Sequence, residues 1–271
     1  MLIQPEIKKC VVYLSYVSKH GKEWAGTGFF VSEPFVEIPE FSVTYLVTSK
    51  HLIEGIKKKS IDGKVNVRIN LIDGGSKSLS FEIDEWKYHN DESVDVAVLS
   101  WTPKNGIFDH AFIGPNLDLT AKVIKDEQIN VGDEVFLTGL FHRHKGENRN
   151  LPIIRVGNIA MMPDEKVWVG NGFAYIDAYL IDLISIEGLS GSPVFVHLGL
   201  SHAKIESGGI SRGSKQLIYW LGMMHGHWKE DKLNPGISIV VPAQKIREVI
   251  NYEKFMKERK EAEKAYKAGL K

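Results

Sequence analysis

GLSGSPVF, residues 188–195, is the stretch of this sequence on which the predicted fold and chemistry depend most. It places Ser190 between Gly188 and Gly191, on a tight turn that larger neighbours would obstruct, so its hydroxyl can stand exposed as a nucleophile requires. Such a turn also aims backbone N–H groups into one concavity, where those of Gly188 and Ser190 could hold an oxyanion. A Gly/Ser-rich surface turn before an apolar strand is the alternative, and the rest of the chain decides between the two.

The composition is that of an ordinary soluble globular protein, with 271 residues, 43% hydrophobic residues, 25% charged residues and a formal net charge of zero. This length is compatible with one large or two modest β-rich domains. The charge balance indicates neither nucleic acid nor a membrane as a partner. Cys10 is the single cysteine, which excludes an intrachain disulfide and favours a reducing compartment. Because the sequence has no leader pattern and no apolar window of membrane-span length, we expect a cytoplasmic protein.

Short apolar runs separated by turns recur along most of the chain. Residues 10–17 and 27–31 are apolar, β-branched and aromatic runs around a polar segment, as in a hairpin. Residues 65–72 alternate apolar and polar side chains up to the turn at 73–75, and Asp95 lies within the run 94–99. The further strand candidates are residues 43–48, 79–83, 134–138, 153–162, 167–169, 174–184, 194–197, 217–224 and 237–241. This spacing predicts an all-β barrel or sandwich rather than alternating helices and strands.

A segment without clear periodicity divides these strands into two series. Residues 102–119 contain prolines and glycines at irregular spacing, so we place an inter-domain linker there. Pro242 opens the one convincing helix, with Ile246 and Ile250 on its apolar face. Mixed charges continue the helical pattern over residues 253–271, which we interpret as a solvent-exposed extension, with a partner-docking helix as the alternative.

His51, Asp95 and Ser190 are the residue types that nucleophilic catalysis needs. A serine hydroxyl requires a base within hydrogen-bond reach, and an imidazole is such a base near its own pKa. The imidazole needs a carboxylate that fixes its tautomer and stabilises its charged form. Asp95 lies between apolar residues of a predicted strand, where an ionised side chain is costly unless it is paired. Taken singly, the histidine could be a satisfied core or surface residue and the aspartate a solvent-facing residue of an edge strand.

Three segments together resemble the active-site motifs of trypsin-like serine proteases. VTSKH (47–51) resembles their catalytic-histidine segment, DVAVL (95–99) their aspartate strand and GLSGSP (188–193) their serine motif. Asp182 precedes the serine at the spacing seen in the high-temperature-requirement group. Further similarity to the bacterial intracellular members lies in GTGFFV (26–31), VGDEVF (131–136), IVVPA (239–243) and KIREVI (245–250). The resemblance thus extends over most of the chain.

The resemblance implies an all-β fold of two six-stranded antiparallel Greek-key barrels (trypsin-like) with a C-terminal α-helix. The expected domains are residues 1–115, which carry the histidine and the aspartate, residues 116–241, which carry the serine, and residues 242–271 as the helix. In this fold the active site lies in the cleft between the two barrels.

The activity that the resemblance implies is that of a serine endopeptidase, which hydrolyses peptide bonds through a Ser-His-Asp triad and an acyl-enzyme intermediate. The catalytic residues would be His51, Asp95 and Ser190, and the oxyanion hole would be the N–H groups of Gly188 and Ser190. We expect a protein or peptide substrate and a regulatory partner protein. No cofactor, metal, nucleic acid or membrane is expected.

The resemblance also implies which residues wall the substrate pocket. They are Ile184, Glu187, Met224, His225, Gly226 and His227. Ile184 stands near the position of the acidic pocket floor of trypsin, which implies an apolar or small residue before the cut. His225 falls where relatives place a serine that holds the aspartate, so it could donate to Asp95 or narrow the cleft. Glu187 would place a negative charge at the rim.

The chain also departs from the pattern of the digestive members. Leu189 replaces an aspartate that pairs with a newly cut N-terminus, which excludes activation by that route. We therefore expect an enzyme that needs no pro-segment removal, or one that is gated by a partner or by loop ordering. Ser192 replaces a common glycine with another small residue.

Two other function classes compete with catalysis by serine. The pairs His225 with His227 and His142 with His144 would each share a face of an extended chain, as metal ligands can. Because no cysteine or carboxylate lies at finger-like spacing, we predict no metal site. The second class is a catalytically silent or gated trypsin-fold binding module, which would be expected to lack a triad member.

Overall fold

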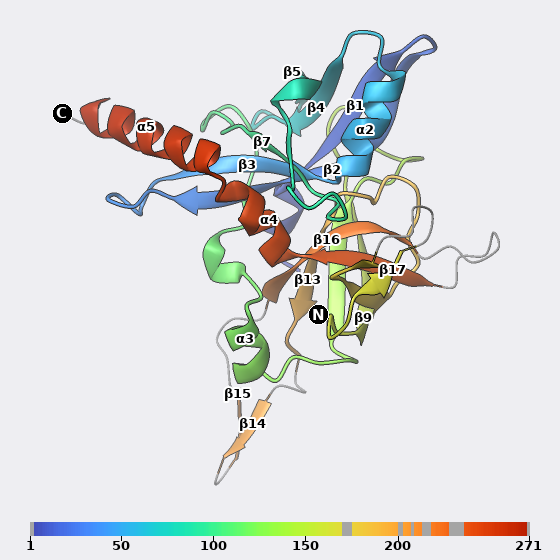
Figure 1. Cartoon of the computed structure of the whole chain (residues 1–271), viewed down its shortest axis with the longest axis vertical. Coiled ribbons are helices and arrows are strands. Elements are labelled where there is room, and N and C mark those ends of the chain that lie inside the picture. The colour runs from blue at the N-terminus through green and yellow to red at the C-terminus, as the bar shows by residue number, and fades with distance from the viewer. Residues whose placement is uncertain are drawn as a thin grey trace.

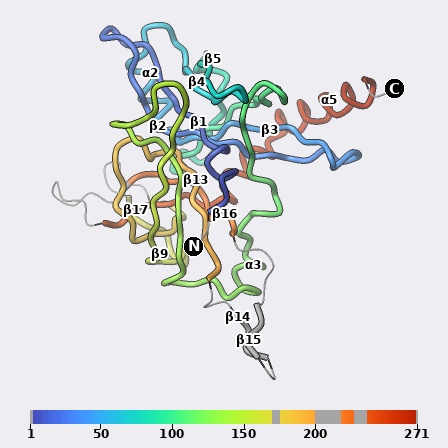
Figure 2. Tube along the Cα trace, turned by 180° about the vertical axis from the view of Figure 1, so that it is seen from behind, coloured from blue at the N-terminus to red at the C-terminus, as the bar shows by residue number. Residues whose placement is uncertain are grey.

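The computed structural model describes residues 3–169, 175–199, 203–206, 209–212, 218–227 and 236–269. Two strand-rich halves lie one above the other, with β1 to β5 in one half and β9, β13, β16 and β17 in the other (Figures 1 and 2). The two views agree on this arrangement.

The first half is a seven-stranded antiparallel sheet with strand order β5-β4-β1-β2-β3-β7-β6. Its strands are β1 (Val11–Ser18), β2 (Gly21–Pro34), β3 (Ser42–Thr48), β4 (Lys64–Asn70), β5 (Ser76–Glu82), β6 (Lys87–Tyr88) and β7 (Ala97–Ser100). The end strands β5 and β6 are consecutive in the chain and are joined by the short 3-10 turn η1 (Ile83–Glu85). The sheet therefore curls round its own hydrophobic core, which includes Leu14, Phe30 and Leu46.

The second half is a closed barrel with strand order β12-β17-β16-β13-β8-β9, which confirms the predicted six-stranded barrel. Its strands are β8 (Glu134–Gly139), β9 (Ile153–Met161), β12 (Tyr179–Asp182), β13 (Pro193–His197), β16 (Ile218–His227) and β17 (Ile237–Pro242). Two small hairpin sheets pair β10 (Val167–Trp168) with β11 (Tyr175–Ile176) and β14 (Ala203–Glu206) with β15 (Gly209–Arg212). The first half differs from the expected six strands by the two-residue strand β6.

The helices are α1 (Glu6–Lys9), α2 (Lys50–Lys59), α3 (Ala121–Asp126), α4 (Ala243–Ile250) and α5 (Glu253–Gly269), with a second 3-10 turn η2 (Pro115–Leu117). The expectation of one convincing helix was wrong, because α2 is a regular helix anchored by the buried Ile53 and Ile56. The C-terminal helix also breaks in two after Asn251, which ends α4. None of the helices in the described ranges combines the length and the hydrophobicity needed to cross a membrane.

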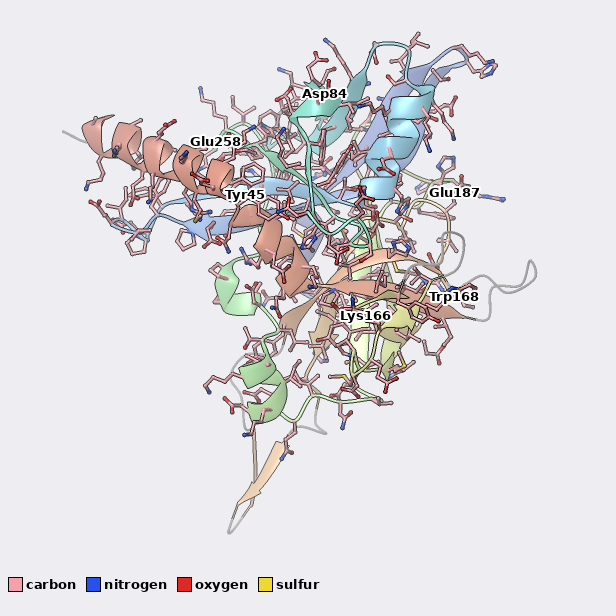
Figure 3. All side chains as sticks on the ribbon, in the orientation of Figure 1. Tyr45, Asp84, Lys166, Trp168, Glu187 and Glu258 are labelled. Carbon is pink, nitrogen blue, oxygen red and sulfur yellow. The ribbon has the colours of Figure 1, made fainter. Side chains whose placement is uncertain are left out.

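One face of helix α5 packs against the rest of the chain, so the helix is not solvent-exposed on all sides. The ring of its buried Phe255 lies edge-on to Tyr45 of β3 at 5.2 Å, and Tyr266 lies 4.4 Å from Phe41. Figure 3 places Tyr45 where α5 passes the β2–β3 hairpin. The prediction of a solvated extension was therefore wrong for this face, since the aromatic contacts give the helix a partner within the chain.

A shared hydrophobic cluster and an ionic clamp join the two halves. The cluster brings together Phe29 and Val47 of the first sheet and Phe136, Phe195 and Trp220 of the barrel.

The clamp is the guanidinium of Arg247 on α4, whose side chain is only 12% exposed. It donates to both oxygens of Asp118 at 2.8 Å, to the carbonyl of Ser32 at 2.9 Å and to the carboxylate of Glu33 at 3.0 Å. The ion pairs are partly buried and span both halves, so the clamp helps to fix the junction between them.

Candidate active site

His51 lies in the first turn of α2, directly after β3 ends at Thr48. The buried Ile53 and Ile56 hold α2 against the sheet, while the His51 side chain remains 43% exposed. The sequence placed His51 just after an apolar strand. In the structure this position is the corner where β3 ends and α2 begins, at the junction between the halves.

Asp95 precedes β7 and does not lie inside a strand, contrary to the prediction. The segment before it turns back on itself, with the Val94 N–H bonded to the Asp91 carbonyl at 3.0 Å, and pairing begins only at Ala97. The flanking Val94 and Val96 are both buried in the cluster that joins the halves. They fix the backbone so that the carboxylate, 9% exposed, faces inward.

The Asp95 carboxylate accepts three hydrogen bonds. Its Oδ1 accepts the His51 backbone N–H at 2.8 Å, and its Oδ2 lies 2.7 Å from Nδ1 of His51. Nδ1 of His225 lies 2.5 Å from the same Oδ2. An ionised carboxylate can only accept, so both imidazoles carry a proton on Nδ1, which leaves Nε2 of His51 as the free basic nitrogen. This is the tautomer that a general base requires.

His225 reaches Asp95 from β16, in the other half of the molecule. The register with β17 shifts between Met224 and Gly226, and this irregularity re-aims the side chain of the residue between them. The two imidazole rings stand edge to face, with centroids 5.4 Å apart. Of the two roles that the sequence left open for His225, the contact with Asp95 is the one present in the structure.

Burial and charge act in opposite directions on the pKa values of this group. Burial disfavours the imidazolium of His51, but the hydrogen bond and the charge of Asp95, helped by Glu54, outweigh it and raise the His51 pKa above its ordinary value of 6.5. Burial also disfavours the Asp95 carboxylate, but its hydrogen bonds to His225 and His51 keep the pKa of Asp95 far below the usual range. The aspartate therefore stays ionised at neutral pH.

The loop that carries Ser190 is held by Thr27 of β2. The Thr27 N–H donates to the carbonyl of Ser190 at 3.1 Å, and its hydroxyl donates to the carbonyl of Gly188 at 2.9 Å. The Thr27 carbonyl accepts the hydroxyl of Thr48 at 2.7 Å, three residues before the candidate histidine. One buried threonine thus connects the serine loop to the strand that delivers the imidazole.

Glycine is required at two positions of this loop. Gly188 has φ +99° and Gly191 has φ +80°, a region that other residues rarely adopt. A Cβ on Gly191 would also lie 2.1 Å from the carbonyl oxygen of Thr27. The loop approaches β2 so closely only because both turns are glycines, as the sequence indicated.

The backbone N–H groups of the serine loop differ in whether they donate a hydrogen bond to a described residue. Leu189, Gly191 and Ser192 donate their N–H groups to backbone carbonyls at 2.9–3.2 Å. Within the described part of the chain, the N–H groups of Gly188 and Ser190, which were the predicted oxyanion donors, have no such partner. The described residues also contain no hydrogen bond between the Ser190 hydroxyl and the His51 imidazole.

The other predicted pocket residues lie in different environments. Ile184 is 54% exposed and Glu187 is exposed; Figure 3 places Glu187 between α2 and β17, at the level where the halves meet. Met224 is fully buried, so it reaches the site only through its carbonyl, which accepts the Gly191 N–H at 2.9 Å. Gly226 is half-buried. The side chain of His227 lies outside the described residues.

One group of residues could hold a metal ion among those described. His51, Asp95 and His225 each offer one ligand atom, and these atoms all lie within 4.8 Å of one another. The observed contacts are direct hydrogen bonds. The extended geometry assumed for His142 and His144 was wrong, because the chain turns there, with the His144 N–H bonded to the Phe141 carbonyl at 3.0 Å.

Sequence reasoning missed Thr27 and Thr48 as supports of the site. The available signal was a threonine with glycine on either side, Gly26 and Gly28, at the start of an apolar run. That signal became meaningful only when the folded chain placed the serine loop, which is far away in sequence, against it.

The strand order, the closed barrel and the junction site define the trypsin-like fold.

Solved structures of the HtrA-type protease AlgW are similar to this chain. A complex with a decapeptide gives a TM-score of 0.53 at 16% sequence identity, and the match covers 90% of this chain and 64% of that one. A complex with a tripeptide gives 0.52 at 16% identity, covering 90% and 60%. The chain thus spans less than two thirds of the length of these proteins. No protein-family model and no curated protein matches the sequence. At this identity the likeness establishes the fold.

Proposed function

We propose that this protein is a serine endopeptidase with His51, Asp95 and Ser190 as its catalytic triad. The observation that supports the proposal most strongly is the buried Asp95 carboxylate, which lies 2.7 Å from Nδ1 of His51 and leaves Nε2 free. The second support is Thr27, which bonds the serine loop to the end of the strand that precedes His51.

In the proposed mechanism, Nε2 of His51 takes the hydroxyl proton as Oγ of Ser190 attacks the scissile carbonyl. The tetrahedral oxyanion accepts hydrogen bonds from the N–H groups of Gly188 and Ser190, which have no other partner among the described residues. The imidazolium then protonates the leaving amine, and water hydrolyses the acyl-enzyme by the same proton route in reverse. Asp95 orients His51 and stabilises its charged form throughout. No cofactor or metal takes part.

The proposed substrate is a protein or peptide, and the AlgW structures that resemble this chain contain peptides. The exposed side chain of Ile184, near the serine loop, supports an apolar or small residue before the cut. We retain the division into residues 1–115, 116–241 and 242–271, a cytoplasmic location and a regulatory partner protein as parts of the same proposal.

A gated or silent binding module is the second candidate, and one observation favours it. Ser190 and His51 make no hydrogen bond with each other in the described structure, so a partner or a bound peptide could be needed to complete the triad. Catalytic hydrogen bonds are often long before substrate binds, and for this reason we prefer the enzyme.

The test is cleavage of an unfolded protein by the parent chain and by Ser190→Ala and His51→Ala. We expect the parent to produce discrete fragments and each variant to lose at least about 10³-fold in rate. Equal cleavage by parent and variants would refute the proposed triad. A parent that cleaves only after a regulatory partner or peptide is added would assign the gated candidate.

A further inference from the structure

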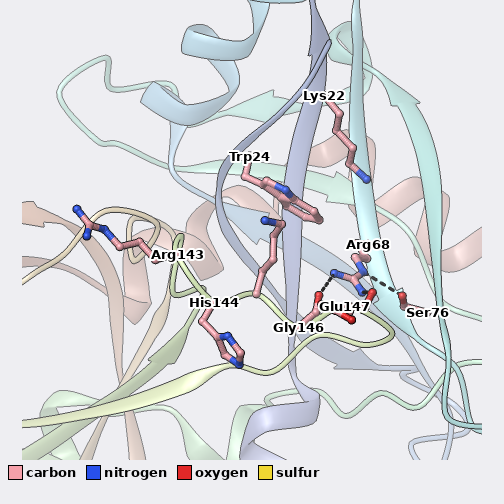
Figure 4. Close-up of a pocket in the computed structure, with 9 residues that line it drawn as sticks. Lys22, Trp24, Arg68, Ser76, Arg143, His144, Gly146 and Glu147 are labelled. Carbon is pink, nitrogen blue, oxygen red and sulfur yellow. Dashed lines mark hydrogen bonds between the residues drawn. The ribbon is translucent and has the colours of Figure 1, made fainter. Parts of the chain in front are cut away.

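A cationic pocket lies between β2 and the loop that follows β8 (Figure 4). It has a volume of about 530 Å³. The residues that line it are Lys22, Trp24, Arg68, Ser76, Arg143, His144, Lys145, Gly146 and Glu147. The lining residues carry several cationic side chains and a single carboxylate, that of the exposed Glu147. The pocket therefore has the charge of an anion site, although the chain as a whole is neutral.

Three cations gather round the ring of Trp24. Nζ of Lys22 lies 4.6 Å from the ring centroid, Nζ of Lys145 lies at 5.6 Å and the guanidinium carbon of Arg68 lies at 5.8 Å. An aromatic face attracts each cation, but it does not neutralise their mutual repulsion. Burial and the charges of Arg68 and Lys145 lower the pKa of Lys22, as expected for a group of cations without a counter-ion.

Arg68 is the unusual member of the group, because it is buried, at 6% exposure, and none of its hydrogen-bond partners among the described residues is a carboxylate. Its Nε donates to the Ser76 hydroxyl at 2.9 Å, and its terminal nitrogens donate to the carbonyls of Gly146 at 2.9 Å and Glu147 at 2.6 Å (Figure 4). All three acceptors are neutral, so no hydrogen-bond acceptor among the described residues compensates the buried charge. An anion beside Lys22 and Lys145 would supply the missing negative charge.

The orientation of one peptide group relates this pocket to the direction of the substrate. The carbonyl of Ser190 accepts from Thr27 on β2, while the N–H of Gly191 donates to Met224 on β16. These two groups belong to the same trans peptide and point in opposite directions, so β2 and β16 lie on opposite sides of the candidate nucleophile. If the residue before the cut lies toward β16, the residues after the cut run toward β2.

The pocket is within reach of such a substrate. A Cβ on Gly26 would lie 3.0 Å from the carbonyl oxygen of Ser190, and Trp24 is two residues farther along β2. At about 3.3 Å per residue of extended chain, the pocket begins about two to four residues after the cut. The loop that supplies Arg143 to Glu147 of the pocket lining also begins close to the serine loop. A Cβ on Gly188 would lie 2.8 Å from the carbonyl oxygen of Leu140, which precedes that lining segment.

We propose that this pocket binds an acidic peptide segment, with aspartate or glutamate side chains that follow the scissile bond seated among Lys22, Arg68 and Lys145. The proposal deepens the endopeptidase function and rests on it for the direction of the substrate. Glu23, the neighbouring acid on β2, does not oppose such a ligand, because Tyr16 and Ser18 hold its carboxylate away from the pocket.

The test measures binding separately from cleavage. A short fluorescein-labelled peptide, with valine at the expected cut and three glutamates after it, is titrated into Ser190→Ala protein and followed by anisotropy. Its isostere with three glutamines is the matched ligand. We expect the glutamate peptide to bind more tightly, with an affinity that falls as salt is added.

Lysine variants in the Ser190→Ala background locate the effect. Each of Lys22→Gln and Lys145→Gln should weaken binding of the glutamate peptide by about 2- to 5-fold at low ionic strength, and the double variant by about their product. The matched control is Lys125→Gln with Lys260→Gln, which removes the same charge from exposed residues of α3 and α5. Unchanged thermal unfolding of each variant shows that the loss is not one of folding.

The outcomes separate the two proposals. Selective binding of the glutamate peptide that depends on the two pocket lysines supports the site even if the parent cleaves nothing, in which case only the protease function fails. Equal affinity for both peptides, or equal losses in the control variant, overturns the acidic-segment site even if the parent is an active protease. Binding of inorganic phosphate by the pocket without any preference between the peptides would assign it to a small anion and also overturn the proposal.

Discussion

Replacing His225 tests how the two halves share the Asp95 carboxylate. His225→Ala removes the donor that lies 2.5 Å from Oδ2 of Asp95, while the His51 donor at 2.7 Å remains. A hydrogen bond to a charged group contributes about 1.5–3 kcal/mol, and the Asp95 side chain is only 9% exposed. We therefore expect His225→Ala to lose about 2 kcal/mol of unfolding free energy at pH 7, measured by denaturant titration.

The pH dependence of this loss follows from the direction of the Asp95 shift. Because the folded-state pKa of Asp95 is lowered, its contribution is complete above the unfolded-state value of about 3.9 and disappears as the pH falls toward the folded-state value. The difference between parent and His225→Ala should therefore shrink as the pH falls below about 4. With one donor fewer on Asp95, His51 keeps more of the carboxylate charge, and the pH midpoint of Ser190 reactivity should rise.

His225→Asn is the matched control, because the Asn amide nitrogen takes the place of Nδ1 and can still donate. It should recover most of the stability that His225→Ala loses. The reasoning is wrong if alanine costs less than about 0.5 kcal/mol, or if asparagine is as damaging as alanine.

Four further predictions concern the proposed triad and its loop. Asp95→Asn should slow phosphonylation of Ser190 by about 10³- to 10⁴-fold, since an amide cannot hold the basic tautomer of His51; labelling kinetics at pH 8 measure this. In the parent, the labelling rate should rise with pH through a midpoint above 6.5, because Asp95 outweighs burial in raising the His51 pKa, and a flat profile would exclude His51 as the base. Gly191→Ala should abolish labelling or lower the melting temperature, because the new methyl would lie 2.1 Å from the Thr27 carbonyl oxygen and the residue has a φ of +80°. Calorimetry and labelling of the same sample measure the two effects. EDTA should leave the labelling rate unchanged, and a rate restored by zinc after chelation would contradict a metal-free mechanism.

Much of the fold could be predicted because short-range patterns carry it. Alternating apolar residues predicted most strands, and the glycines around Ser190 predicted a turn that only glycine can form. Two local patterns misled. The apolar run VDVAVL was interpreted as a strand, but the chain turns before Val94 and Asp95 lies outside β7. Helix α2 was missed because it buries only two isoleucines and ends in three lysines, which leaves a weak apolar pattern.

The features that could not be predicted depend on contacts between distant parts of the chain. Thr27 supports the serine loop across 161 residues, and nothing in its own segment announces that contact. The sequence offered two roles for His225, and the contact with Asp95 could be chosen only from the register shift in β16 that places it opposite the carboxylate. The cationic pocket combines Lys22, Arg68 and Lys145 from three separate segments, so no local run of basic residues predicts it.

The most direct test of the proposed triad is intact-mass analysis after exposure to a fluorophosphonate, which reacts with an activated serine and needs no knowledge of the substrate. The account predicts a single adduct on the parent chain, none on Ser190→Ala and a strongly slowed reaction on His51→Ala. A folded parent that gains no adduct at a pH where His51 is neutral would contradict it, as would an adduct that persists on Ser190→Ala.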